Sequence, residues 1–370
     1  MKKNIVIVVS AMNMGGAQRV VSILSDHWSQ NGHSVTLIIT FTDEIKNHYR
    51  INENVNVRYL SNNRFFPKNK FLNLTWKLLQ LRKVIKAQNP DVVLSFLARV
   101  NVATTLATIG MKSSLIICER TWPPFASLNN NILWIYKLLF KRVDRIIVQT
   151  DKSKSWLRDR FPTNNVTVIP NPVSYPLSSE SHSLVSPVSC LPDNKKVILG
   201  SGRMHKIKQF DVLIKAFSQI KENYIDWDLI ILGDGEEREY LKKVINDLNI
   251  QDRVFFPGRV GNIAEWYERA DLFVLSSIVE GFPNVLLEAM AYGVPSISFD
   301  CDTGPREMIK DGVNGILVDP EEKELGLLKA LEKMISDEEF RSRIASNSIL
   351  IRDQYSIDSI MQEWDGALDS

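Results

Sequence analysis

The chain has 370 residues, a length that predicts two domains, each large enough to bury a core. Its 44% hydrophobic and 24% charged residues are typical of a globular protein, and it lacks the run of about 18 apolar residues that a membrane-spanning helix needs. The net charge of +2 divides unevenly: residues 1–185 hold 24 basic and 10 acidic residues, and residues 186–370 hold 21 and 33. We therefore expect a basic half that faces an anionic surface and an acidic half that faces the cytosol.

The first residues, MKKNIVIVVSAM, have the charge and hydrophobicity of a secretory signal peptide. Their apolar core is short and no small-residue cleavage site follows it, so we expect a buried first strand at Asn4–Val9 instead. Three cysteines, Cys118, Cys190 and Cys301, lie far apart without a CxxC pair or a histidine cluster. This spacing favours reduced thiols and a cytosolic compartment.

Short apolar strands alternate with helical segments through the first half of the chain. A helix with one apolar face is predicted from Ala17 to Asn31, directly after the loop that holds Gly15 and Gly16. Further strands are predicted at Ser34–Ile39, Val55–Leu60, Asp91–Ser95, Ser114–Cys118, Asp144–Val148 and Asn165–Ile169. This alternation predicts an α/β fold, a parallel sheet with helices on both faces.

Two segments of this half are both basic and aromatic. Residues 64–86 carry seven basic side chains and no acidic one, interleaved with phenylalanine, tryptophan and leucine, and residues 131–142 have the same character. Such a helix binds an anionic membrane surface. The alternative is a pair of helices whose apolar faces are buried while their lysines reach out to solvent. We expect membrane contact and no nucleic-acid binding, because no nucleic-acid-binding module is recognisable.

Glu119 and Arg120 follow the strand Ser114–Cys118, at the sheet edge where ligands of α/β proteins usually bind. They are candidate substrate contacts, and an Arg–Glu pair that only holds the loop is the alternative. Residues 170–195 are rich in proline and serine and show little apolar periodicity, which is typical of a connection between domains. We expect a first domain at residues 1–175, a linker at 176–195 and a second domain at 196–355.

The second domain repeats the alternation of strands and helices. Strands are predicted at Lys196–Ser201, Leu229–Leu232, Arg253–Phe256, Asp271–Leu275 and Ser296–Ser298, the last completing the sheet. A hairpin-like turn is predicted at Gly312–Gly315, helices over Glu321–Arg352, and a final helix over residues 356–368. Arg203 lies just after the first of these strands and Lys208 at the start of the next helix, so both are expected at the same edge of the sheet.

Two glutamates bracket the turn that follows the strand Asp271–Leu275. Glu280 lies in the loop, Pro283 suits the first turn of a helix, and Glu288 lies inside that helix, which Gly293 ends. A helix N-terminus attracts an anion such as a phosphate, and a carboxylate can accept two hydrogen bonds from the vicinal hydroxyls of a sugar. The alternative is that Glu280 only stabilises the helix dipole and that Glu288 is a solvated surface residue.

Glu280, Glu288 and the residues between them resemble the E-x7-E motif of the retaining GT-B glycosyltransferases of family 4. The resemblance extends over nearly the whole chain, through the Gly15–Gly16 loop, the Gly202–Arg203 pair with Lys208 five residues on, and Gly233–Asp234–Gly235. It implies the GT-B fold, two Rossmann-like doubly wound domains that face a cleft, with the final helix packing back on the first domain. The stretch Asp300–Glu307 is similar to a loop of the bacterial members that build surface polysaccharides.

The resemblance also implies roles for individual residues. Arg203 and Lys208 would bind the diphosphate of a nucleotide sugar, Glu280 the hydroxyls of the donor sugar, and Glu288 those of the ribose. The remaining implied substrate contacts are the backbone at Gly15, Gly16, Arg259, Val260, Phe282, Pro283, Asn284 and Val285. Members of the family often carry a histidine near Cys118, where this chain has Glu119 and Arg120 instead, and this departure leaves them as candidate donor contacts.

These roles predict transfer of a sugar from a nucleotide sugar to a lipid-linked saccharide, of the undecaprenyl-diphosphate type, at the inner membrane face. The donor expected is a uridine diphosphate N-acetylhexosamine or hexose, and a guanosine diphosphate mannose donor remains open. A nucleotide-sugar epimerase of the same fold and a non-catalytic membrane-binding module are the alternatives. We expect neither a metal nor another cofactor, because Arg203, Lys208 and the helix end supply the positive charge, and Asp300–Cys301–Asp302 is expected to form a turn.

Overall fold

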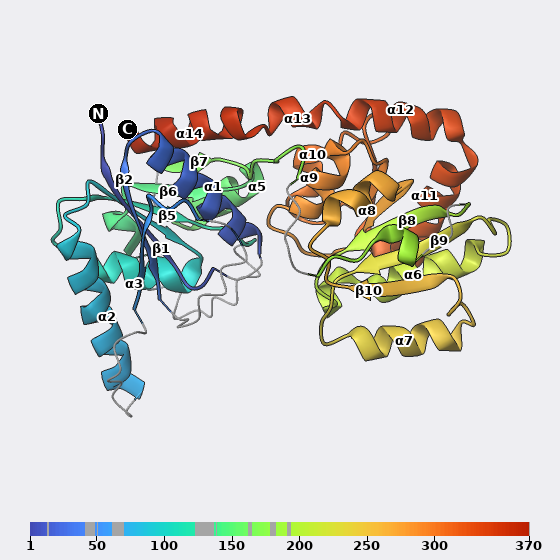
Figure 1. The fold of residues 1–370 in the computed structure, drawn as a ribbon, viewed down its shortest axis with the longest axis horizontal. Helices are drawn as coiled ribbons and strands as arrows, with labels where there is room; N and C mark the ends of the chain where they lie inside the picture. The colour runs from blue at the N-terminus through green and yellow to red at the C-terminus, as the bar shows by residue number, and fades with distance from the viewer. Residues whose placement is uncertain are drawn as a thin grey trace. The chain divides into compact units, whose positions relative to one another are not determined.

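The computed structural model describes the chain except residues 13–14, 41–48, 50, 61–69, 123–136, 138, 162–164, 178–182, 191–193 and 370, and the side chains of 70–72. The chain forms two compact units (Figure 1). The first comprises Met1–Asn171 with Ile360–Ser370, and the second comprises Pro172–Ser359. Residues 176–195, the expected linker, therefore fall within the second unit.

The first unit is built on one parallel sheet, as the alternation of strands and helices predicts. Over its described residues this sheet has seven strands in the order β3-β2-β1-β4-β5-β6-β7. The strands are β1 (Asn4–Val9), β2 (Ser34–Ile39), β3 (Asn56–Tyr59), β4 (Val92–Phe96), β5 (Ser114–Cys118), β6 (Arg145–Val148) and β7 (Val166–Val168). The predicted strands are confirmed to within one residue at each end.

Alternate residues of these strands face opposite layers of helices. Val6 and Val8 belong to a core shared with Leu81 and Ile85 of α2 and with Val100 of α3. Helices α1 and α14 cover the other face (Figure 1). Besides α14 (Ile357–Asp369), the α-helices in the described part of this unit are α1 (Gly16–Gln30), α2 (Lys70–Ala87), α3 (Ala98–Ala107) and α5 (Asp151–Arg160).

Helix α14 (Ile357–Asp369) packs against the first unit through Trp364. The Trp364 ring is fully buried and meets Trp28 of α1 edge-on, at 6.2 Å between ring centroids. Asp365 follows on the helix, and its Oδ1 accepts a hydrogen bond from the Trp28 indole nitrogen at 2.9 Å. At the far end, the Lys3 ammonium donates to the carbonyl of Leu368 at 2.6 Å. Burial of the Trp28 and Trp364 rings, together with the hydrogen bond of the Trp28 indole nitrogen, stabilises the packing of this terminal helix.

The second unit repeats the architecture with a parallel sheet in the order β10-β9-β8-β11-β12-β13. Its strands are β8 (Lys196–Ser201), β9 (Trp227–Leu232), β10 (Val254–Gly258), β11 (Leu272–Leu275), β12 (Ser296–Phe299) and β13 (Ile316–Val318). The helices that follow them are α6 (Phe210–Ile220), α7 (Arg238–Asp247), α8 (Ile263–Arg269), α9 (Asn284–Ala291), α10 (Pro305–Met308), α11 (Lys323–Ser336), α12 (Glu338–Ser348) and α13 (Ile351–Gln354).

Strand β13 was not predicted, and the expectation that Ser296–Ser298 completes the sheet is wrong. This strand has three residues at the edge of the sheet, too few to show an alternation of apolar and polar positions. It pairs with β12 in parallel. The turn at Gly312–Gly315 is confirmed, but it leads into this parallel edge strand and does not join two antiparallel strands of a hairpin.

The basic aromatic segment at 64–86 is described from Lys70 onward, as helix α2. Its second half has a buried face, on which Leu81 and Ile85 enter the core. Leu74 and Leu79 are instead 67% and 64% exposed. The helix therefore combines the buried face of the alternative interpretation with the exposed apolar side chains that membrane contact needs. Of the second segment, 131–142, residues 131–136 and 138 lie outside the described residues.

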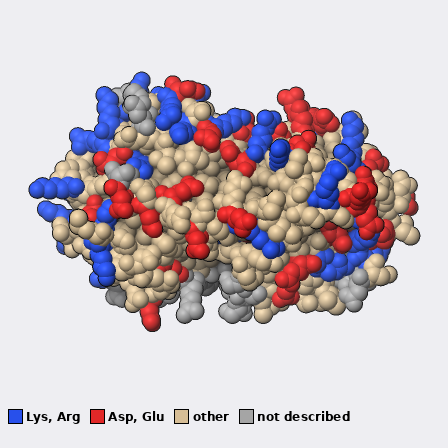
Figure 2. Space-filling view, turned by 90° about the horizontal axis from the view of Figure 1, so that it is seen from above, with Lys and Arg blue, Asp and Glu red and all other residues tan. Residues whose placement is uncertain are grey.

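The surface that carries α14 is mixed in charge. Figure 2 shows the first unit from the side of α14, and acidic and basic side chains are interspersed on that face of it. In Figure 1, α2 lies at the lower left, on the side turned away from that view. Within the described part of the chain, none of the helices has the length and hydrophobicity to span a membrane.

All three cysteines are free thiols. Burial raises the pKa of Cys118 to about 12, with Arg120 acting in the opposite direction. Burial also raises the pKa of Cys301 to about 12, and the Glu280 carboxylate adds to this shift. Both thiols are therefore protonated near neutral pH and unreactive, because the thiolate is the nucleophilic form.

Candidate functional site

The order of strands in the second sheet reverses at β8, and several candidate residues lie near this point. From β8 the chain proceeds outward through β9 and β10, then returns to the other side of β8 with β11, β12 and β13. The loops that follow β8 and β11 therefore leave two adjacent strands in divergent directions. Ligands of open α/β sheets bind in the crevice at the carboxyl ends of the strands at such a reversal.

Lys208 and Glu280, one from each of these loops, meet directly. The Lys208 ammonium donates to Oε1 of Glu280 at 2.5 Å, and the two side chains are only 16% and 12% exposed. Spacing along the sequence placed both residues at this edge, and the structure brings them into contact. An ion pair so shielded from water is electrostatically stronger than one on an open surface.

Backbone contacts hold the two loops together around this pair. The Ser276 hydroxyl donates to the carbonyl of Lys208 at 2.7 Å, and the amide of Ile278 donates to the carbonyl of Ile207 at 2.9 Å. The Thr303 hydroxyl donates to the carbonyl of Glu280, which ties the loop after β12 to the same place. The Lys208 and Glu280 side chains thus project from a fixed frame.

Arg203 lies in the loop after β8 and remains 68% exposed on its side chain. Its Nη2 and Nε approach Oε2 of Glu236, a residue of the loop after β9, at 3.1 and 3.2 Å. His205 lies 3.5 Å from the same carboxylate. Hydrogen bonding by its own amide, and then the charges of Arg203 and His205, lower the pKa of Glu236. Sequence reasoning did not single out Glu236, although it directly follows the turn Gly233–Asp234–Gly235.

Helix α9 begins beside this frame with Asn284, directly after Pro283. Its first turn carries no acidic side chain, so nothing on the helix itself neutralises the positive end of its dipole. Glu288, one turn further, is only 4% exposed, which excludes the alternative that it is a solvated surface residue. Its Oε2 accepts a hydrogen bond from the Tyr267 hydroxyl at 3.0 Å.

The other predicted contacts of this unit differ in exposure. The Phe282 side chain is 7% exposed and packs on Tyr355 at 5.7 Å between ring centroids, so Phe282 has only its backbone to offer a ligand. Val285 is half-buried, Arg259 is exposed and Val260 half-buried in the loop after β10. The N-terminus of α9, the loop with Arg203 and Lys208 and the loop with Arg259 therefore all lie at the carboxyl ends of the strands of this sheet.

The predicted contacts of the first unit lie at the carboxyl ends of its own strands. Gly15 precedes α1, and its amide donates to the Tyr49 hydroxyl at 3.3 Å. Glu119 follows β5 and is 5% exposed, and its Oε1 accepts a hydrogen bond from Asn101 at 2.7 Å. Gly16, the first residue of α1, is exposed. These residues therefore form a polar edge at the carboxyl ends of the strands of the first unit.

Arg120 is 8% exposed and surrounded by aromatic rings. Its guanidinium carbon lies 5.2 Å from the centroid of the Trp364 ring and 5.4 Å from that of Phe96, and its Nη1 donates to Oδ1 of Asn171 at 3.1 Å. Burial lowers the pKa of Arg120. Cation–π contacts with a desolvated guanidinium are strongly stabilising, so these contacts favour a structural role in which Arg120 holds α14.

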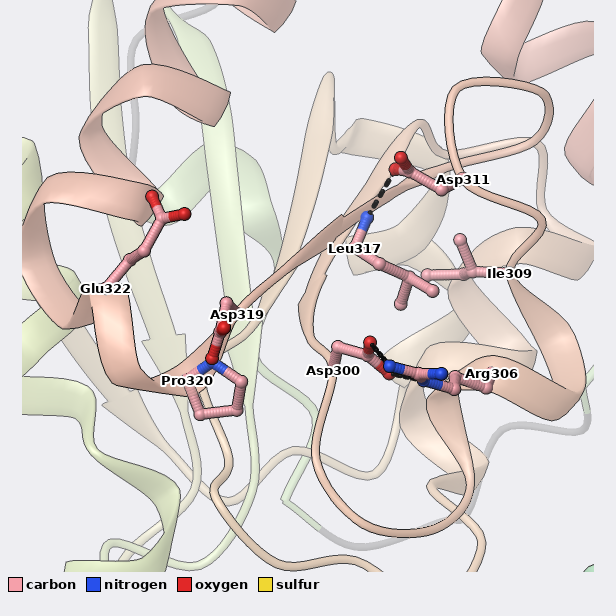
Figure 3. A pocket seen from close by; sticks show the side chains of 8 residues that line it. All are labelled: Asp300, Arg306, Ile309, Asp311, Leu317, Asp319, Pro320 and Glu322. Atoms are coloured by element: carbon pink, nitrogen blue, oxygen red, sulfur yellow. Dashed lines mark hydrogen bonds and ion pairs between the residues drawn. The ribbon is translucent and has the colours of Figure 1, made fainter.

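An open pocket of about 660 Å³ lies beside the candidate site, at the ends of β12 and β13 (Figure 3). Asp300, Asp311, Asp319 and Glu322 line it, and Arg306 pairs with Asp300 on one side of it. One cation against four carboxylates repels a diphosphate, so this pocket is not the phosphate site. Within the described residues, no three histidine, cysteine, aspartate or glutamate side chains are grouped so as to hold a metal ion.

Comparison with known proteins agrees with this geometry. Residues 186–350 match the family described as "Glycosyl transferases group 1", and residues 14–175 match "Glycosyltransferase Family 4". An uncharacterized glycosyltransferase of Methanocaldococcus jannaschii is 30% identical over 80% of this chain and 82% of its own length. A Campylobacter jejuni enzyme, GalNAc-alpha-(1->4)-GalNAc-alpha-(1->3)-diNAcBac-PP-undecaprenol alpha-1,4-N-acetyl-D-galactosaminyltransferase, is 29% identical over 96% of both chains. The solved structure of Anabaena Alr3699/HepE in complex with UDP superimposes with a TM-score of 0.79 at 20% identity, covering 99% of both chains.

Two parallel-sheet domains and these matches define a GT-B glycosyltransferase, an enzyme that transfers a sugar residue. Within that class, the chain belongs to glycosyltransferase family 4.

Proposed function

We propose that this enzyme transfers an N-acetylhexosamine or hexose from a UDP-sugar to a lipid-linked saccharide, with retention of anomeric configuration, in the synthesis of a surface polysaccharide such as an O-antigen. One observation carries the proposal: Lys208 and Glu280 meet at the reversal point of the second sheet, next to the start of α9. There a cation and a helix N-terminus would bind the diphosphate, and Glu280 would bind the donor sugar beside it.

In the proposed reaction, the bond between the anomeric carbon and the β-phosphate oxygen breaks, and the acceptor hydroxyl oxygen bonds to that carbon. The departing diphosphate takes the acceptor's proton. Negative charge therefore grows on the diphosphate as the bond breaks, where Arg203 and Lys208 would stabilise it. Glu288 would accept hydrogen bonds from the ribose hydroxyls, and the backbone at Arg259, Val260 and residues 282–285 would complete the donor site.

The choice of donor and acceptor rests on the relatives. The Campylobacter jejuni enzyme is named as an N-acetylgalactosaminyltransferase acting on an undecaprenol-linked saccharide, and the Anabaena structure is a complex with UDP. We also propose Glu119, at the end of β5, as a substrate contact. We place the enzyme at the cytoplasmic membrane surface, where a lipid-linked acceptor would be found.

The test is release of nucleoside diphosphate from UDP-N-acetylgalactosamine, UDP-N-acetylglucosamine, UDP-glucose and GDP-mannose, each with an undecaprenyl-diphosphate-linked saccharide. We expect acceptor-dependent release of UDP, and a product whose anomeric configuration by NMR is that of the donor. Release from GDP-mannose alone would identify a mannosyltransferase. Conversion of the donor without acceptor would identify an epimerase, and no release from any donor would leave only a binding protein.

We expect this reaction to need no divalent cation, because Arg203, Lys208 and the N-terminus of α9 carry the charge that a metal would otherwise supply. Treatment with excess EDTA should leave the rate of UDP release unchanged. A loss of activity that magnesium or manganese restores would contradict this prediction.

We propose that α2 brings the enzyme to an anionic membrane. Leu79 lies on the exposed side of the helix with Lys83 and Lys86, where an apolar side chain can enter the lipid and lysines can meet its headgroups. The exchange Leu79→Glu should weaken binding to phosphatidylglycerol vesicles, measured by cosedimentation, by about tenfold or more, since burying a leucine side chain in an apolar environment contributes roughly 1.5–3 kcal/mol.

Leu325 of α11 is the matched control, because it is 56% exposed but lies in the second unit. The exchange Leu325→Glu should leave vesicle binding unchanged. Equal losses for the two variants would show that α2 is not the contact. Added salt should weaken binding of the wild-type protein, because screening reduces attraction between exposed charges.

A further inference from the structure

Glu288 is held by a buried tyrosine that no sequence motif marked. The Tyr267 hydroxyl lies 3.0 Å from Oε2 of Glu288 and 3.3 Å from the carbonyl oxygen of Val285. Both partners are acceptors, and the hydroxyl has one proton to donate. Donation to the ionised carboxylate is the stronger of the two, because charge-assisted hydrogen bonds are about twice as strong as neutral ones. Tyr267 therefore orients one oxygen of Glu288.

Packing fixes the Tyr267 ring in this position. The side chain is 1% exposed, and its ring meets Phe273 of β11 at 6.2 Å and Tyr292 at 5.6 Å between centroids. Tyr292 is held in turn, since its hydroxyl accepts a hydrogen bond from the Leu177 amide at 2.8 Å. A ring enclosed on these sides has little freedom to turn, so its hydroxyl stays aimed at the carboxylate.

We infer that Tyr267 is a positioning residue that sets the selectivity of this site for ribose. The inference rests on the proposed role of Glu288 as the ribose ligand. A carboxylate binds a vicinal diol with both oxygens at once, so the orientation of its plane determines whether both hydroxyls can form well-aligned hydrogen bonds. Oε2 has lone pairs for both Tyr267 and a ribose hydroxyl, which means that the tyrosine orients the carboxylate without occupying its binding capacity.

The sharpest test compares a ribonucleotide with its 2′-deoxy counterpart. UDP and 2′-deoxy-UDP are titrated into the wild-type enzyme, Tyr267→Phe and Glu288→Gln by calorimetry, with GDP and 2′-deoxy-GDP as a second pair. The exchange Tyr267→Phe removes one oxygen and keeps the ring. It should weaken ribonucleotide binding roughly tenfold, as expected for a hydrogen bond to a charged group, and should affect the deoxynucleotide far less. The preference of the enzyme for ribose should therefore shrink.

The exchange Tyr292→Phe is the matched control, because it removes a hydroxyl from the same aromatic stack that is hydrogen-bonded to the Leu177 amide and does not donate to the Glu288 carboxylate. It should lower the melting temperature about as much as Tyr267→Phe and leave the ribose preference unchanged. In steady-state turnover, Tyr267→Phe should raise KM for the donor with little change in kcat, since binding of ribose is the same in the ground and transition states.

The outcomes distinguish a failure of the positioning role of Tyr267 from a failure of the proposed donor site. If Glu288→Gln abolishes the ribose preference and Tyr267→Phe retains it in full, the positioning role is refuted and the proposed function stands. If Glu288→Gln retains the preference, or if the wild-type enzyme binds neither UDP nor GDP, the proposed donor site is itself refuted. A reduced preference in both variants, with Tyr292→Phe like the wild type, establishes the inference.

Discussion

Replacing Lys208 by alanine should lower kcat for sugar transfer by about 10²–10³-fold, as expected when one preorganised donor to a developing negative charge is lost. The reason is its position. Its ammonium group is only partly exposed and is aimed by Glu280 and by the backbone contacts of Ser276 and Ile278. A cation shielded from water stabilises the departing diphosphate more than a solvated one does. Because this charge exists in the transition state, kcat and kcat/KM should fall together.

Lys206 provides the control for this experiment. It lies in the same short 3₁₀ turn, two residues away, and its side chain is exposed. The exchange Lys206→Ala should therefore leave kcat within about twofold of the wild type, since an exposed charge is screened by solvent. Loss of Lys208 also leaves the Glu280 carboxylate without this partner, so melting curves of Lys208→Ala and of the longer Lys208→Met should be recorded. Wild-type kcat in both folded variants would refute the proposed role of Lys208.

The meeting of Lys208 with Glu280 shows how far sequence reasoning reaches in this protein. Each residue follows a short apolar strand, and the carboxyl ends of parallel strands share one edge of a sheet, so both could be placed there from the sequence. The contact itself depends on β8 and β11 being neighbours. Strand order is a property of the whole sheet, and the hydrophobic pattern of single segments does not contain it.

Tyr267 and Arg120 show what the sequence conceals. Tyr267 acts on Glu288 from a short helix, and its role depends on how that helix packs against the next one, where Glu288 lies 21 residues later. Arg120 was predicted as a candidate substrate contact because it follows a strand. That position cannot reveal that Trp364, 244 residues later, returns to pack over its guanidinium. Side chains from other elements of the fold decide both roles, so the sequence pattern immediately around either residue does not reveal them.

Replacing Gly233 by alanine should destabilise the second unit by more than about 4 kcal/mol, a size that is exceptional for one substitution. Gly233 follows β9 with φ +122°, a conformation that side chains rarely adopt. An added Cβ would lie 1.9 Å from the carbonyl oxygen of Gly202 and 2.9 Å from its carbonyl carbon. Neither backbone can yield, because the Gly202 amide donates to Leu232 at 3.0 Å and the Gly233 amide to Gly258 at 2.7 Å. The loop that carries Arg203 would be forced away from β9, and donor binding should be lost with it.

Two further glycine-to-alanine exchanges separate the effect of the steric clash from the effects of backbone strain and of the added methyl group. Gly110 also has a positive φ, +76°, but a Cβ there meets no atom within 4 Å, so Gly110→Ala should cost only the backbone strain of about 1 kcal/mol. Gly366 lies inside α14 with open space around it, so Gly366→Ala should be neutral or stabilise by about 0.4–1 kcal/mol. Melting midpoints by circular dichroism should rank Gly233→Ala far below both, with UDP binding lost only there. If Gly233→Ala instead melted like Gly110→Ala and bound UDP normally, the close approach of the β8 and β9 loops could not be what shapes this site.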